Sequence, residues 1–192
     1  MRWVTRRAES RLLGTRLASL TVGDSVVYAS HGLGRVTLKE TRNARDVECE
    51  VVVVEFREGL SVTLPLERAF EYLRPVSDEA ELEQVRRVLR GSPVEAAVWQ
   101  TRLRVAQEKV AVGSAIGLAE VIRNSARRDE EIRARGNGGM LSLAERGLYQ
   151  KARQLLADEI GSSRGIESAE ADAWIDEQLA VGSHLGAAPS PI

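Results

Sequence analysis

A tryptophan close to two arginines is the group in this 192-residue chain whose chemistry best suits contact with a nucleic acid. Trp99 is followed by Arg102 and Arg104, and residues 84–110 carry six basic and two acidic side chains. An aromatic ring flanked by guanidinium groups can enter a distorted minor-groove step while the arginines bind flanking phosphates. A structural interpretation remains open, because Trp99 and Leu103 also fit one stripe of a buried helix.

Other basic residues lie farther along the chain and could enlarge this surface. Arg146 and Lys151 belong to a later segment with helical periodicity. For a single arginine, a solvated helix face is the more common situation. The remaining candidates are Arg123, Arg127, Arg128 and Arg153.

The chain offers few residues suited to catalysis or metal binding. His31 and His184 are its two histidines, and neither has a cysteine or another histidine at metal-ligand spacing. Gly32-Leu33-Gly34 precedes a predicted strand rather than a helix, which indicates a sharp corner and not a phosphate loop. We therefore predict that the protein is not an enzyme and needs no cofactor or metal.

Composition describes a globular protein rather than a disordered or membrane-spanning one. Hydrophobic residues make up 43% and charged residues 29%, and the formal net charge is -1. The longest strongly apolar run, at residues 51–54, is far too short for a membrane span. Cys49 is the single cysteine, so no intrachain disulfide can form and a reducing cytoplasm is expected.

The elements that must hold these residues are strands in the first part and helices in the second. Periodicity and turn residues predict strands at 22–28, 34–41, 48–56 and 60–64, and the segment 65–75 then closes a small barrel. Helices are predicted from a cap at Ser77, from Ser92-Pro93 to Val112, after Ser114, from a capping box at Ser142, and from Ser168.

The stretch 22–36 carries a family resemblance. A Gly23-Asp24 turn leads into an alternating strand, and a His31-Gly32-x-Gly34 corner reverses the chain. This arrangement closely resembles the opening strands of the CarD family of bacterial transcription regulators. Similarity to that family extends over roughly residues 22–180 and includes the sequence around Trp99.

The resemblance implies that the helical part binds DNA. In this family a tryptophan at a helix start wedges into the minor groove at the upstream edge of the melted promoter region, and basic residues follow it. Thr101 stands where close relatives have the first of those basic residues. Carried over to this chain, the implied DNA-binding residues are Trp99, Arg102, Arg104, Arg146 and Lys151.

The resemblance also implies that the barrel is a Tudor-like module that binds the β subunit of RNA polymerase through an exposed strand edge. Arg42 matches a polymerase-contacting arginine, and Thr63 stands where close relatives have a second one. Val53 lies on the valine-rich strand, for which strand addition is a physically reasonable mode of binding. The expected polymerase-binding residues are thus Arg42, Thr63 and Val53.

These observations predict an α+β protein, with a small Tudor/SH3-like β-barrel followed by an all-α domain of about five helices. We expect a basic flexible extension at 1–20, the polymerase-interacting domain at 21–75, the DNA-binding domain at 76–181 and a disordered tail at 182–192. We expect a cytoplasmic monomer, associated with the nucleoid through RNA polymerase.

The expected function is transcription regulation: the barrel binds RNA polymerase, and the helices stabilise the open complex on promoter DNA with low sequence specificity. The alternative is a protein-only adaptor, whose barrel binds RNA polymerase or a repair translocase and whose helices bind another protein. Trp99 would be buried in that case.

Overall fold

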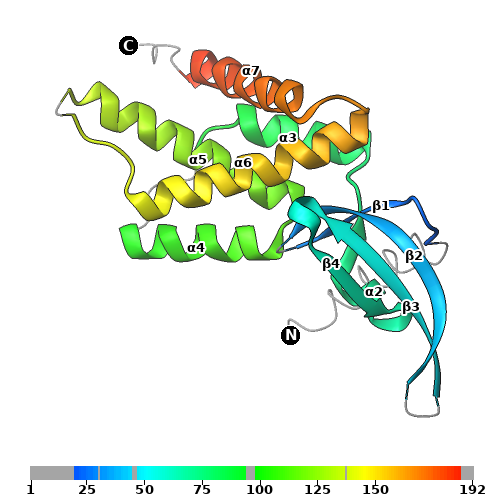
Figure 1. Cartoon of the computed structure of the whole chain (residues 1–192). Coiled ribbons are helices and arrows are strands. Elements are labelled where there is room, and N and C mark those ends of the chain that lie inside the picture. The colour runs from blue at the N-terminus through cyan, green and yellow to red at the C-terminus, as the bar shows by residue number, and fades with distance from the viewer. Residues whose placement is uncertain (1–19, 30, 45–46, 94–97, 137, 187–192) are drawn as a thin grey trace, which may run out of the picture. The chain divides into compact units, whose positions relative to one another are not determined.

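The computed structural model describes residues 20–29, 31–44, 47–93, 98–136 and 138–186. The chain forms two compact units that meet between Val76 and Ser77, and each is described by itself. Figure 1 shows the first unit in blue to cyan-green and the second in green to red. Of the predicted basic extension, only Leu20 belongs to the described residues.

The first unit is built on one antiparallel sheet with the strand order β4-β3-β2-β1-β5. Two long central strands form a hairpin, and shorter strands pair on either side of it. The strands are β1 (Ser25–Tyr28), β2 (Gly32–Ala44), β3 (Val47–Phe56), β4 (Ser61–Pro65) and β5 (Leu73–Pro75).

The segment after β4 joins the two ends of this unit. It forms helix α2 (Leu66–Tyr72), which the sequence reasoning did not predict, and then β5, which pairs with β1. Ala69 of α2 and Leu73 of β5 belong to the same buried cluster as Val52 and Val54 of β3. The segment 65–75 thus covers the core of the curled sheet, and β4 and β5 lie at the two edges of that sheet.

Small residues and aromatic rings shape the corner between β1 and β2. A Cβ atom at Gly34 would lie 2.7 Å from the Phe56 ring, so only glycine fits against that ring. His31 stacks on Tyr28 with ring centroids 5.2 Å apart, and it lies 5.6 Å from Phe56. His31 therefore has a packing role in this corner.

The second unit is all-helical. Its helices are α3 (Glu79–Arg90), α4 (Trp99–Val112), α5 (Ala115–Ala134), α6 (Leu143–Arg164) and α7 (Ser168–Gly186). Helix α5 packs on α3 and α6, and α7 packs on α3 and α6, around a core that includes Leu82, Ile122, Leu156 and Ile175. The predicted α+β fold class is confirmed. None of the described helices is long and apolar enough to cross a membrane.

The start of α3 differs from the prediction. Asp78, not Ser77, caps the helix, because its side chain accepts a hydrogen bond from the Glu81 N–H at 3.0 Å. Ser77 instead donates its backbone N–H (3.0 Å) and its hydroxyl (2.7 Å) to the carboxylate of Glu159 on α6. The predicted cap was therefore wrong by one residue, since a partner 82 positions away holds Ser77.

Two other helix boundaries, the start of α4 and the end of α7, also differ from the prediction. Helix α4 begins at Trp99 rather than at Ser92-Pro93, and residues 94–97 lie outside the described part. Helix α6 ends at Arg164, where the following Gly165 adopts a left-handed φ of 67°. Helix α7 reaches Gly186, so His184 lies in a helix and the predicted tail begins too early.

Candidate functional site

Trp99 is exposed at the first position of α4. Its exposed fraction is 44%, and that of the preceding Val98 is 74%. No residue of α4 is fully buried, and the helix contacts the core through the partly buried Ala106 and Val110. The apolar stripe predicted on this helix packs on the core at Ala106 and Val110, but it does not bury Trp99. The buried interpretation of Trp99 was wrong.

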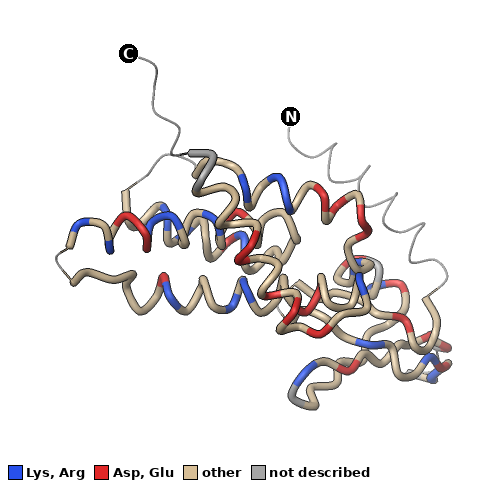
Figure 2. Tube along the Cα trace, turned by 90° about the horizontal axis from the view of Figure 1, so that it is seen from above, with Lys and Arg blue, Asp and Glu red and all other residues tan. Residues whose placement is uncertain are grey.

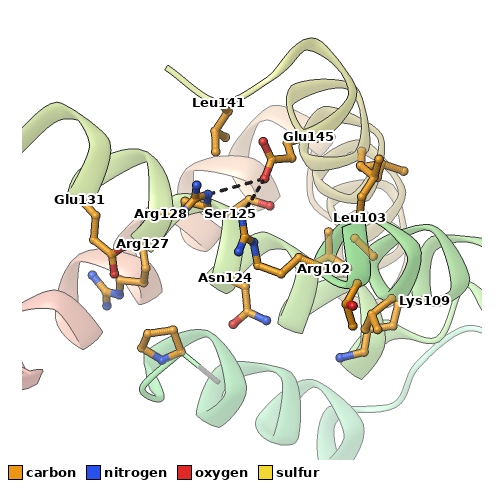
Figure 3. Close-up of a pocket in the computed structure, with 16 residues that line it drawn as sticks. Arg102, Leu103, Lys109, Asn124, Ser125, Arg127, Arg128, Glu131, Leu141 and Glu145 are labelled. Carbon is orange, nitrogen blue, oxygen red and sulfur yellow. Dashed lines mark ion pairs between the residues drawn. The ribbon is translucent and has the colours of Figure 1, made fainter. Parts of the chain in front are cut away.

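The two arginines predicted beside Trp99 lie in different environments. Arg104 is well exposed and forms an ion pair with Glu108, with an N–O distance of 3.0 Å. The side chain of Arg102 is only 25% exposed, and its guanidinium lies 3.9 Å from Glu145 on α6. Figure 3 shows Arg102 and Arg128 both directed at this carboxylate. Arg102 therefore helps to hold α4 against α6.

A cavity of about 420 Å³ lies between α4, α5 and α6. Its wall includes apolar side chains, among them Leu103, Val121 and Leu141, and the basic side chains Arg102 and Arg128. The salt bridge from Lys109 to Glu120, at 2.7 Å, secures the later part of the helix.

Glu145 is the charge that links these helices. Burial disfavours its ionised form, but hydrogen bonds from the hydroxyl and backbone N–H of Ser142, and the charges of Arg128 and Arg102, lower its pKa below the ordinary value. Ser142 and Glu145 also form the predicted capping box at the start of α6. One carboxylate thus caps α6 and anchors α4.

We expect Glu145→Gln to destabilise the helical unit by about 1–2 kcal/mol at pH 7, because two partly buried arginines lose their counter-charge. The lowered pKa means that Glu145 stabilises the fold above about pH 4.3, its unfolded value, and that this contribution is lost as the pH falls through the folded pKa. Chemical unfolding followed by circular dichroism between pH 3 and 7 measures both effects.

Glu108→Gln is the matched control for this prediction. Glu108 also pairs with an arginine of α4, but both side chains are exposed, and such pairs contribute little. We expect a change below about 0.5 kcal/mol at every pH. Identical pH profiles for the two variants would contradict the anchoring role of Glu145.

Arg146 and Lys151 lie exposed on α6, as a DNA-contacting role requires. Neither forms an ion pair with any other residue in the part of the chain that the structure describes. Figure 2 shows basic and acidic positions interspersed along the chain. A basic residue without an ion-pair partner is therefore a candidate for binding an anion. The structure places these two residues on a different helix from Trp99.

The other arginines considered from the sequence have structural partners. Arg123 is 6% exposed and donates to the Val88 carbonyl and to Asn124; burial, together with the charge of Arg127, lowers its pKa although Glu120 opposes this. Arg127 donates to the Leu179 carbonyl at 3.0 Å. These residues connect α5 to α3 and α7 and are not available to phosphates.

Arg153 is likewise engaged, between α6 and α7. It donates to Asp172 at 2.8 Å and to Asp176 at 2.6 Å. Burial alone would lower its pKa, but these hydrogen bonds and one to Tyr149 raise it. Arg153 is therefore part of the helix packing.

In the first unit, the three residues expected to contact polymerase share one face of the sheet. Val53 pairs with Thr63, and Arg42 pairs with Cys49. Paired residues lie on the same face, and Cys49 and Val53 are an even number of positions apart on β3. Arg42 is exposed and bonded to Glu40 of the same strand.

Leu38 completes this face, and the sequence reasoning missed it. It pairs with Val53 immediately after a bulge in β2, and it is 39% exposed. A leucine in an alternating strand is expected to point inward, and no local signal reveals a bulge. The row Leu38–Val53–Thr63 leads across the sheet to the edge strand β4.

A curled antiparallel sheet followed by a five-helix unit with an exposed tryptophan is the two-unit architecture of this protein. Residues 20–77 match the model of the CarD-like/TRCF RID domain, and residues 84–176 match that of the CarD C-terminal domain. The chain belongs to the CarD family. The RID match implies an interaction with RNA polymerase.

A curated relative supports the assignment to transcription. The chain is 23% identical over 148 residues to a Bacillus subtilis protein named "Putative transcription factor YdeB". The aligned region covers 76% of this chain and 92% of the relative. The similarity thus spans most of both proteins.

Proposed function

We propose that this protein binds the β subunit of RNA polymerase with its first unit and stabilises the open promoter complex with its second. The observation that carries the proposal is the exposure of Trp99 at the start of α4. A large aromatic ring left 44% exposed costs favourable burial, which a binding partner can restore. The basic residues Arg104, Arg146 and Lys151 are exposed on the same unit and suit phosphate contacts.

The mechanism is differential binding to two states of the DNA. A ring that fits an unwound, kinked step better than a closed duplex shifts the equilibrium toward the open complex by the difference in affinity. Each 1.4 kcal/mol of that difference corresponds to about tenfold. The minor groove offers a degenerate pattern of hydrogen-bonding groups, so sequence specificity would be low.

Strand addition at β4 is the proposed mode of polymerase binding. Strand β4 lies at one edge of the sheet, and its residue Thr63 is exposed. An edge strand offers backbone groups to a partner strand, while the neighbouring face formed by Leu38, Val53 and Arg42 supplies side-chain contacts.

Open-complex lifetime tests the function as a whole. The cognate RNA polymerase is bound to a promoter, competitor is added, and the decay of open complexes is followed with and without the full chain. We expect the protein to lengthen the lifetime. If the lifetime is unchanged while the protein is bound to polymerase, the proposed function is wrong.

The polymerase contact gives a separate prediction. Arg42→Glu is expected to weaken binding of the full chain to RNA polymerase by about tenfold, because it reverses a charge on the proposed contact face. Lys39→Glu is the matched control, since Lys39 lies three positions away on the opposite face of β2 and is also exposed. Biolayer interferometry with immobilised polymerase measures both. Equal losses for the two variants would show a general charge effect instead of a contact at Arg42.

A further inference from the structure

The cavity between α4, α5 and α6 has the size of a small-molecule binding site. Its volume is about 420 Å³, and pockets for small ligands in proteins are about 300–1,000 Å³. The contacts proposed above for DNA and polymerase involve residues outside it. Aliphatic side chains from all three helices and from the segment before α6 form much of its wall: Leu103, Val105, Ala106, Val121, Leu141 and Leu148. An occupant with an apolar body would give these side chains the contacts that they lack.

Arg128 of α5 brings a cation with unused donors to the same wall. Its Nε is buried and has no hydrogen-bond acceptor among the described residues, and the side chain as a whole is 30% exposed. The carboxylate oxygen paired with it, Oε1 of Glu145, lies 3.6 Å from Nε, which is too far for a hydrogen bond. Buried donors are almost always satisfied in native proteins. An additional acceptor beside Arg128 would therefore be favourable.

Glu145 is too heavily shared to be that acceptor. Its Oε2 accepts hydrogen bonds from the backbone N–H of Ser142 at 3.1 Å and from the Ser142 hydroxyl at 2.7 Å. Its Oε1 faces both Arg102 and Arg128, as Figure 3 shows. One carboxylate thus caps α6 and faces two guanidinium groups, and a second anion would complement Arg128.

The charges of the wall indicate which anion fits. Glu131 and Glu145 both line the cavity, so an ion with two negative charges would be repelled more strongly than one with a single charge. A carboxylate presents two oxygens in one plane, which matches the donors of a guanidinium. Asn124 and Ser125 add neutral polar groups to the wall. A singly charged carboxylate therefore suits this site better than a phosphate.

We propose that this cavity binds a small monocarboxylate with an aliphatic body. The carboxylate accepts hydrogen bonds from Arg128, and the aliphatic part packs against Leu103, Val121 and Leu141. Helix α4 also carries Trp99, so the occupant contacts the helix that the proposed function assigns to DNA. The binding itself requires neither DNA nor polymerase and is independent of that function.

Octanoate is the probe, and it is titrated into the full ¹⁵N-labelled chain while amide signals are followed by nuclear magnetic resonance. The compounds 1-octanol and octylamine share its aliphatic chain and serve as neutral and cationic references. We expect octanoate to bind about tenfold more tightly than octylamine, because hydrogen bonds to charged groups are the stronger ones. The largest shifts should occur at residues of the wall, such as Val121 and Leu141.

Arg128→Gln tests the contact to the carboxylate. We expect it to weaken octanoate binding about tenfold and to leave octanol binding unchanged, which also shows that the cavity is intact. Arg133→Gln is the matched control, since Arg133 lies on the same helix, is exposed, pairs with Asp129 and does not line the cavity. It should bind octanoate as the wild type does.

Three results would overturn the proposal. The first is the absence of octanoate binding at millimolar concentration, and the second is a set of shifts confined to residues outside the wall. The third is equal octanoate affinity of Arg128→Gln and the wild type, which would leave an apolar cavity without selectivity for an anion. None of these results bears on the open-complex lifetime, so the proposed function is judged separately.

Discussion

Replacing Trp99 with alanine is expected to shorten the lifetime of the open promoter complex about tenfold relative to the complex with the wild-type protein. Stacking between an aromatic side chain and a base contributes about 1–3 kcal/mol when measured by alanine substitution. A loss of 1.4 kcal/mol in the open state alone corresponds to tenfold. The lifetime is measured by competitor challenge with the cognate polymerase.

The fold should tolerate this substitution. Trp99 lies at the first position of α4, and it belongs to neither buried cluster of the described residues. Circular dichroism and thermal unfolding of Trp99→Ala should therefore match those of the wild type.

Two further tryptophan variants show whether the effect is specific. Trp99→Phe keeps an aromatic ring and should retain a large part of the lifetime. Trp174→Phe changes a partly buried ring of α7, which packs 4.7 Å from the Arg164 guanidinium, and should have no effect on the promoter complex. An open complex as long-lived with Trp99→Ala as with the wild type would refute the wedge.

Removing the carboxylate of Glu159 is expected to cost about 3 kcal/mol of unfolding free energy. Glu159 is 1% exposed and accepts two hydrogen bonds from Ser77, which is 3% exposed. In Glu159→Ala, a buried N–H and a buried hydroxyl lose this acceptor, and each unsatisfied group costs about 1–3 kcal/mol. A truncated side chain in the core adds to this cost.

Urea unfolding followed at the helical circular dichroism band measures this loss. Glu159→Gln keeps an acceptor oxygen at the same place, so we expect it to lose less than half as much. Ser77→Ala removes only the hydroxyl and should fall between the wild type and Glu159→Ala. A change below about 0.5 kcal/mol in Glu159→Ala would show that this contact contributes little to the fold.

Local sequence signals predicted the features that local interactions decide. The capping box of Ser142 and Glu145 lies within one helical turn and is present, and the helix predicted after Ser114 begins at Ala115. The connection between the strands predicted at 48–56 and 60–64 is also local, and Gly59 within it has a left-handed φ of 74°. Such signals can be recognised because the whole interaction lies within a few residues.

Features that depend on distant partners could not be predicted in this way. Ser77 had every property of a helix cap, but Glu159 captures it from α6. The arginines considered for the DNA-binding surface could not be told apart in the sequence, yet Arg123 and Arg153 are bound to carbonyl or carboxylate groups of other helices. The exposure of Trp99 was equally undetermined, because a stripe pattern does not show where along a helix the core ends.

The anchoring of Ser77 lowers the DNA affinity that the second unit would need in order to act on a promoter. Pro75 pairs with Val26 in the sheet, and Ser77 is bonded to Glu159, so the covalent link between these two anchored residues is the single residue Val76. If the first unit binds polymerase and the second binds DNA, as proposed, such a short connection makes DNA binding after polymerase docking an intramolecular event, with an effective concentration on the order of millimolar. A dissociation constant in the high micromolar range would then be enough to occupy the promoter. Only DNA that already carries polymerase would be bound.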